Sequence, residues 1–122
     1  MAAISVQSLA AFTALNHTYG SVTSLDTVAN DGNTILLFKN GNASARTLTL
    51  TGVATTVPGF GTISSADTTE TITIPGSGTN GGECVVGLMP PNRFNNNSGQ
   101  VVLTIDVTTG LTVAAVSLAR PA

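Results

Sequence analysis

The sequence predicts an all-β fold: an antiparallel β-sandwich of jelly-roll or immunoglobulin-like type, with a short irregular N-terminal arm. Short runs of alternating apolar and polar residues recur along the chain, as in half-buried strands. Clusters of Gly, Asn, Pro and Asp separate these runs. No long stretch has the spacing of an amphipathic helix. The 122 residues suit one domain, which we divide into an arm at 1–20 and a sandwich at 21–122.

The N-terminal segment has the weakest pattern. From residue 6 to residue 15, the apolar positions Val6, Leu9, Ala10 and Phe12 suit either a short helix or an irregular arm. Residues 21–25 are a candidate strand. The regular part of the fold is therefore expected to begin after residue 20.

The central segment contains two strands joined by a turn. Residues 34–39 form a β-rich run with a turn cluster on each side. In residues 46–51, Leu48 and Leu50 point to one face and three threonines to the other. Asn40 and Gly41 lie between the two runs and predict a hairpin, because Asn-Gly favours the tight turns of antiparallel strands.

Four more strands are predicted in the C-terminal half. Residues 69–74 alternate, with Ile72 and Ile74 inward, and residues 83–88 form a short strand that Pro90 follows. Residues 100–107 and 111–118 are two strong strands. The Thr-Thr-Gly segment between them predicts a second hairpin.

Composition excludes several classes of function. Charged residues make up 8% of the chain and the net charge is −2, so no basic cluster is available to bind nucleic acid. No apolar stretch approaches the roughly 20 residues that a membrane-spanning helix needs, and no secretory signal pattern is visible. Cys84 is the one cysteine. We therefore expect folding in a reducing cytosol, with no nucleic acid or membrane as partner.

The residues that catalysis needs are scarce. His17 is the one histidine and the one candidate base, and we interpret it as a surface or interface residue. We expect Cys84 to act as a small apolar side chain in its strand. One His and one Cys do not make a zinc site. Asp26, Asn30 and Asp31 lack the spacing of a calcium loop, and no two carboxylates stand out as a glycosidase pair. The chain is therefore predicted to have no catalytic residues, metal or cofactor.

A loop at residues 90–97 is the more interesting feature. It places a cation, Arg93, beside an aromatic, Phe94, on a turn rich in Pro and Asn. Arg and aromatic side chains are enriched where proteins contact one another, so both residues are candidates for an interface. The alternative is that Phe94 packs back on the sandwich.

Two segments of the chain resemble a known family. Residues 30–41 read NDGNTILLFKNG and are followed by a Thr-Leu strand at 46–50; residues 87–95 read GLMPPNRFN and precede the final Val- and Thr-rich strands. This set, spanning about residues 22–118, is similar to small structural proteins of tailed bacteriophages and prophages. Members are often head decoration, or cement, proteins on the capsid exterior, and no catalytic residue comes with the resemblance.

The resemblance implies a protein that binds the outside of the head shell and stabilises it. The partners would be the major capsid protein and further copies of the chain, with a trimer favoured over a dimer because head shells offer threefold positions. The protein would be made in the host cytoplasm and reside on the virion. Decoration proteins often use a terminal arm, so Leu9, Phe12 and His17 join Arg93 and Phe94 as interface candidates.

Two other functions remain open. The first is a phage tail or fibre module that binds a host surface glycan. It has the same fold class, but few aromatics, Tyr19 and four Phe, are available to stack on a sugar. The second is a small hydrolase, which the lack of a convincing base or metal set disfavours.

Overall fold

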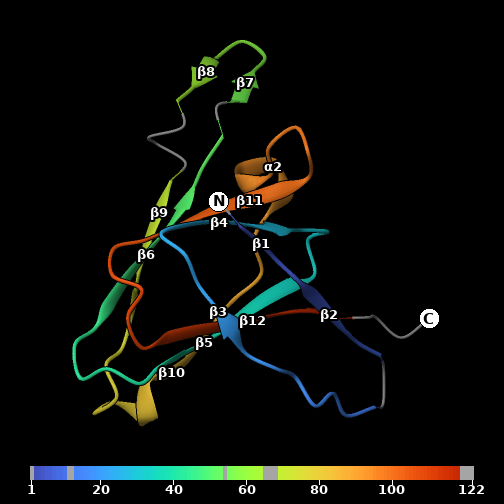
Figure 1. Ribbon diagram of the computed structural model, residues 1–122. Helices are drawn as coiled ribbons and strands as arrows, with labels where there is room; N and C mark the ends of the chain where they lie inside the picture. Colours follow the sequence, from blue (N-terminus) through green and yellow to red (C-terminus); the bar gives the residue numbers. More distant parts are fainter. Residues whose placement is uncertain (1, 11–12, 54, 65–68, 119–122) are drawn as a thin grey trace.

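The computed structural model describes residues 2–10, 13–53, 55–64 and 69–118. Two sheets pack face to face, and a short two-stranded ribbon extends from one end (Figure 1). The prediction of an all-β sandwich is confirmed. No helix in the described ranges is long and apolar enough to cross a membrane.

The first sheet has five strands in the order β1-β4-β11-β6-β9. β1 runs parallel to β4, and the other neighbours are antiparallel. Its strands are β1 (Ala2–Ile4), β4 (Leu25–Ala29), β11 (Gln100–Ile105), β6 (Arg46–Thr51) and β9 (Glu70–Ile74).

The second sheet has the order β10-β5-β12-β2, with the short strand β3 also paired to β12. Here β2 runs parallel to β12, and the other pairs are antiparallel. Its strands are β10 (Glu83–Val86), β5 (Thr34–Asn40), β12 (Leu111–Leu118), β2 (Val6–Leu9) and β3 (Gly20–Ser21).

The core lies between the two sheets. The inward side chains predicted from the alternation are buried there, including Leu48 and Leu50 of β6 and Leu103 and Ile105 of β11. Ile74 is fully buried, and Ile72 is partly buried against the same cluster. Because successive strand residues point to opposite faces, the period of two identified the core side of β6, β9, β11 and β12 correctly.

Both predicted hairpins are wrong, although the strands they were meant to join are present. β5 and β6 lie in different sheets, and so do β11 and β12. Each connection is an arch that carries the chain across the core from one sheet to the other. The two arches touch, since the Gly41 N–H donates to the Gly110 carbonyl oxygen at 2.8 Å. Alternation reveals the inward face of a strand but not its neighbour in the sheet.

Asn40 explains why the first turn becomes an arch. Its side chain is fully buried, and its carbonyl oxygen accepts the N–H of Asn42 at 3.0 Å. Its amide donates to the carbonyl oxygens of Ser44 and Pro75, at 2.8 and 3.1 Å. The side chain thus satisfies three backbone groups around the turn, while β10 and β12 occupy the two edges of β5 at which a hairpin partner could pair.

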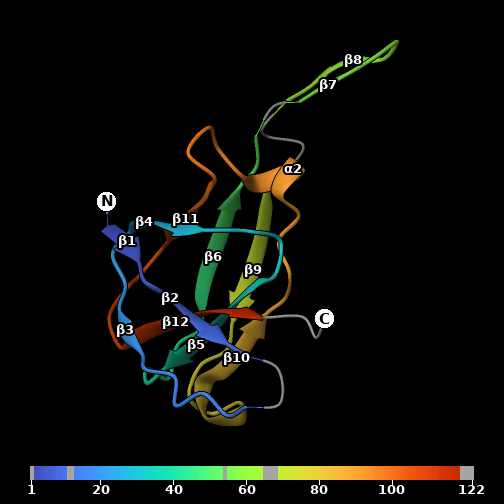
Figure 2. The ribbon, with the colours of Figure 1, turned by 90° about the vertical axis from the view of Figure 1, so that its right-hand side faces the viewer.

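The N-terminal segment forms strands where we expected a helix or an irregular arm. Residues 2–4 and 6–9 are β1 and β2, so the segment joins one edge of each sheet in turn. Backbone pairing at these edges replaces the hydrogen bonds that a helix would supply. Residues 13–19 have no regular secondary structure and cross the outside of the second sheet before β3 (Figure 2).

Two short helices and a ribbon complete the fold. The 3-10 helix η1 spans Asn80–Gly82, and α2 spans Pro91–Phe94. β7 (Thr55–Val57) pairs with β8 (Gly61–Ile63) in a ribbon that we call the finger, residues 55–63. Figures 1 and 2 both show the finger pointing away from the sandwich at the end where α2 lies.

Candidate functional site

The described residues do not assemble a metal site. No three His, Cys, Asp or Glu side chains among them lie close enough to hold an ion. The three side chains considered as calcium ligands each bind different partners within the chain. Asp26 accepts hydrogen bonds from the N–H and hydroxyl of Thr23. The Asn30 amide donates to Met89 O and Asn95 Oδ1, both at 2.8 Å, and Asp31 faces Ser117.

The candidate base and nucleophile, His17 and Cys84, both line a pocket of about 320 Å³. His17 is exposed, and its ring packs edge-to-face on Tyr19 with centroids 5.2 Å apart. Cys84 lies half-buried against the core, as expected for a small apolar side chain. Burial raises the pKa of its thiol, which disfavours the reactive thiolate.

Two aspartates stabilise turns. The Asp31 carboxylate accepts the Asn33 N–H at 2.8 Å and the Ser117 hydroxyl at 2.9 Å, which lowers its pKa. Asp106 accepts the N–H of Thr47 at 2.9 Å, which likewise lowers its pKa. Hydrogen bonds to the charged form of a carboxyl favour ionisation. Both carboxylates therefore act as ionised hydrogen-bond acceptors that stabilise the local backbone.

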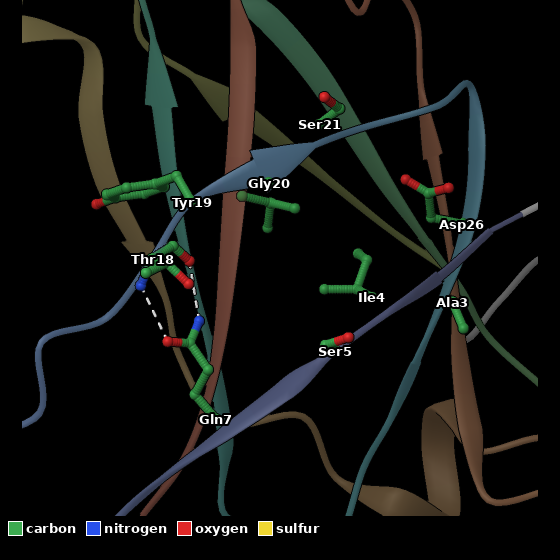
Figure 3. Close-up of a pocket in the computed structure, with 10 residues that line it drawn as sticks. Ala3, Ile4, Ser5, Gln7, Thr18, Tyr19, Gly20, Ser21 and Asp26 are labelled. Carbon is green, nitrogen blue, oxygen red and sulfur yellow. Dashed lines mark hydrogen bonds between the residues drawn. The ribbon is translucent and has the colours of Figure 1, made fainter.

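A polar groove of about 260 Å³ runs along the inner side of the N-terminal segment (Figure 3). The Gln7 side chain spans it, since Nε2 donates to Thr18 O and Oε1 accepts the Thr18 N–H, both at 2.9 Å. Asp26 lies at the far end with 2% of its surface exposed. Because the side chains of Gln7 and Asp26 both form hydrogen bonds within the chain, the groove marks where the N-terminal segment is attached to the rest of the domain.

An apolar groove of about 250 Å³ lies on the outside of the second sheet. Leu15 and His17 of the N-terminal segment line one side, and Ile35 and Leu37 of β5 line the other. The predicted interface residue Leu9 belongs to this lining as well. The structure thus brings two of the three arm candidates together. The third, Phe12, lies outside the described residues.

The Arg93–Phe94 pair does not form a joint contact surface. Arg93 Nη2 donates to Glu70 Oε2 at 2.6 Å, and its guanidinium lies over the Phe94 ring at 4.9 Å. Phe94 itself is 5% exposed and belongs to the core. The prediction of Phe94 as an interface residue is corrected: the ring packs back on the sandwich, the alternative we had kept open. Arg93 remains accessible above it.

Phe60, which no sequence pattern singled out, is the most exposed large apolar side chain of the described residues, at 77%. It lies in the turn of the finger between Gly59 and Gly61, whose φ values are +79° and +111°. The available signal was a Pro-Gly-Phe-Gly turn between two β-prone triplets, 55–57 and 61–63. We had read no element there.

Comparison with known proteins does not identify a relative. No family model matches the sequence, and no significant match was found among curated proteins or solved structures. The functional argument therefore depends on the surface and on the residues described above.

Proposed function

We propose that the chain is a non-catalytic structural protein that decorates the head shell of a tailed bacteriophage. The observation that carries the binding role is the character of the described surface. It exposes several large apolar side chains, led by Phe60, Val85 and Leu88, and no described cluster converges on a metal. Small-molecule sites are concave with converging polar groups, whereas exposed apolar side chains on projecting segments suit contact with another protein.

The assignment to a capsid rests on the resemblance of residues 30–41 and 87–95 to phage structural proteins. The chemistry agrees with it, because the sandwich has one cysteine and needs no disulfide to close. Many copies on a lattice also multiply individually weak contacts. We therefore propose the major capsid protein as the partner, on the outer surface of the shell, with further copies of the chain as neighbours.

Binding of the purified chain to head shells of the phage that encodes it tests the proposal. Shells prepared without the protein are mixed with it, pelleted and imaged by electron microscopy. We expect saturable density on the outer surface and greater resistance of the shell to heat. The Arg93→Ala variant, which keeps Phe94 in the core, tests whether the α2 loop, residues 90–97, contacts the shell. Val107→Ala, at an exposed apolar position in the arch between β11 and β12, is the matched control.

Two results would contradict the proposal. Binding confined to tails or fibres would favour the glycan-binding module, which a glycan array would then test. Failure to bind any part of the particle under conditions where the chain is folded would remove the virion role.

A further inference from the structure

Two neighbouring rows on the outer face of the second sheet are apolar, although they point away from the core. Leu37 of β5 lies directly opposite Val85 of β10 and Ala114 of β12. In the next row Ile35 lies opposite Val116. This part of the sheet is therefore apolar on both faces, a pattern typical of sheets that are covered on both sides, whereas the next row of the outer face is polar, with Lys39 opposite Glu83 and Thr112.

The described residues of the N-terminal segment cover only part of this face. Ala114 and Val116 are buried, but Ile35 and Leu37 remain partly open to solvent and Val85 is 61% exposed. The apolar groove of about 250 Å³ lies between the segment and the sheet. Among the described residues, its lining contains no Asp, Glu, Lys or Arg, so this groove suits an uncharged, apolar occupant.

The finger carries an occupant of that kind. Residues 58–64 contain no charged side chain, and Phe60 is presented at the turn by two glycines with positive φ. An aromatic ring that is 77% exposed retains most of its surface to bury on binding. Phe60 is thus the part of the described surface that best matches the groove in polarity.

The finger cannot reach the groove of its own chain. Figures 1 and 2 show the finger at one end of the sandwich and residues 13–19, which border the groove, at the other. We infer that the Phe60 finger of one copy inserts into the apolar groove of a second copy, between its N-terminal segment and the outer face of β5 and β12.

Such a contact is heterologous, because two different surfaces meet. Each copy then keeps one free finger or one free groove, and assembly continues until a ring closes or a row forms. The contact is independent of shell binding: it predicts association of the purified chain in solution, whether or not a capsid is its partner.

Sedimentation equilibrium at up to about 1 mM protein tests the contact. Phe60→Ala removes the ring, and Ala14→Glu places a charge at an exposed position that lines the groove. We expect the wild type to associate with rising concentration and each variant to associate at least about tenfold more weakly, since burying an aromatic ring is worth that factor or more. Val107→Ala, an exposed apolar position away from both surfaces, should associate as the wild type does.

Mixing the two variants provides the sharper test. The Phe60→Ala chain still offers a groove, and the Ala14→Glu chain still offers a finger. An equimolar mixture should therefore form a 1:1 complex that does not grow, at concentrations where each variant alone is monomeric. Far-UV circular dichroism confirms folding; if Ala14→Glu fails to fold, Thr13→Glu, at another exposed position of the lining, takes its place.

Three outcomes would overturn the inference. They are a wild type that stays monomeric at 1 mM, undiminished association of the Phe60→Ala chain, and association of the Ala14→Glu chain equal to that of the wild type. The last would indicate contact between two fingers. A shell-binding result, positive or negative, would leave the inference unaffected.

Discussion

The finger and the α2 loop leave the same end of the sandwich, and each carries a phenylalanine close to a proline, yet the two rings differ in their surroundings. Phe94 is 5% exposed and Phe60 is 77% exposed. The α2 loop is attached by Asn30, whose amide donates to Met89 O and Asn95 Oδ1, while the Asn95 amide donates back to Asn30 O, each at 2.8 Å.

Two hydrogen bonds attach the chain to the sandwich near the base of the finger. Near its base, the Gly52 N–H donates to Thr69 Oγ1 and the Val53 N–H donates to Arg93 O, both at 2.9 Å. Beyond these bonds, its two strands pair with each other. The difference shows that an aromatic close to a proline becomes part of the core where buried amides attach its loop to the sandwich, and becomes a surface feature where it lies at the turn of a projecting ribbon.

The largest expected effect comes from Phe94→Ala. Removing a buried ring loses its transfer free energy and leaves a cavity, so the free energy of unfolding should fall by about 3–5 kcal/mol. Urea denaturation followed by circular dichroism measures the change. A loss below about 1 kcal/mol, typical of surface positions, would mean that the ring is not packed in solution.

Asn30→Ala should weaken the attachment of the α2 loop. The substitution leaves the Met89 carbonyl and Asn95 Oδ1 without this donor, and each unsatisfied buried group costs about 1–3 kcal/mol. Amide hydrogen exchange should speed up at Phe94 and Asn95 and stay unchanged in the finger. Equal acceleration in both regions would show that the two are coupled.

Acid should affect the Asn30–Gly32 turn, against which Pro91 lies, but not the finger. The pKa of Asp31 is lowered by the Asn33 N–H and the Ser117 hydroxyl. A lowered folded-state pKa contributes stability that is fully present above the ordinary pKa of Asp, about 3.9, and this contribution is lost as the pH falls below that value and through the lowered pKa. Asp31→Asn should flatten this part of the pH dependence of unfolding. An unchanged profile would assign the effect to other carboxyls.

Arg93→Ala should cost little. Its ion pair with Glu70 is about half exposed, and such pairs contribute about 0–1 kcal/mol. Stacking on Phe94 adds about 0.5–1 kcal/mol. Unfolding in low and high salt, with Glu70→Gln as the comparison, separates the two, because salt screens the ion pair. A loss as large as that of Phe94→Ala would mean that the guanidinium holds the loop in place.

Phe60→Ala should have the smallest effect on stability, within about 0.5 kcal/mol, because its ring is exposed. The same urea titration measures it. A loss above about 1 kcal/mol would show that the finger folds back on the sandwich in solution, and the contrast with Phe94 would then fail.

The predicted interface residues show that the sequence did not determine which side chains are accessible. Arg93 and Phe94 were chosen together because their residue types are common at contacts, but only Arg93 is accessible. Phe60 was overlooked because its triplets are too short to read as strands. Leu9 and His17 were grouped from their place in the chain, and the structure brings them together because β2 lies along β12.

By itself, the sequence determined the all-β class, the strands β5, β6, β9, β10, β11 and β12, and the inward face of those with clear alternation, because side-chain direction alternates within a strand and needs no partner. Only the tertiary structure decided which strands are neighbours. The arch that contains Asn40 joins β5 to β6, and it contacts the arch that joins β11 to β12. In each case the two joined strands lie in opposite sheets. Pairing, and with it the exposure of each aromatic, depends on contacts between residues far apart in the chain, which local patterns do not encode.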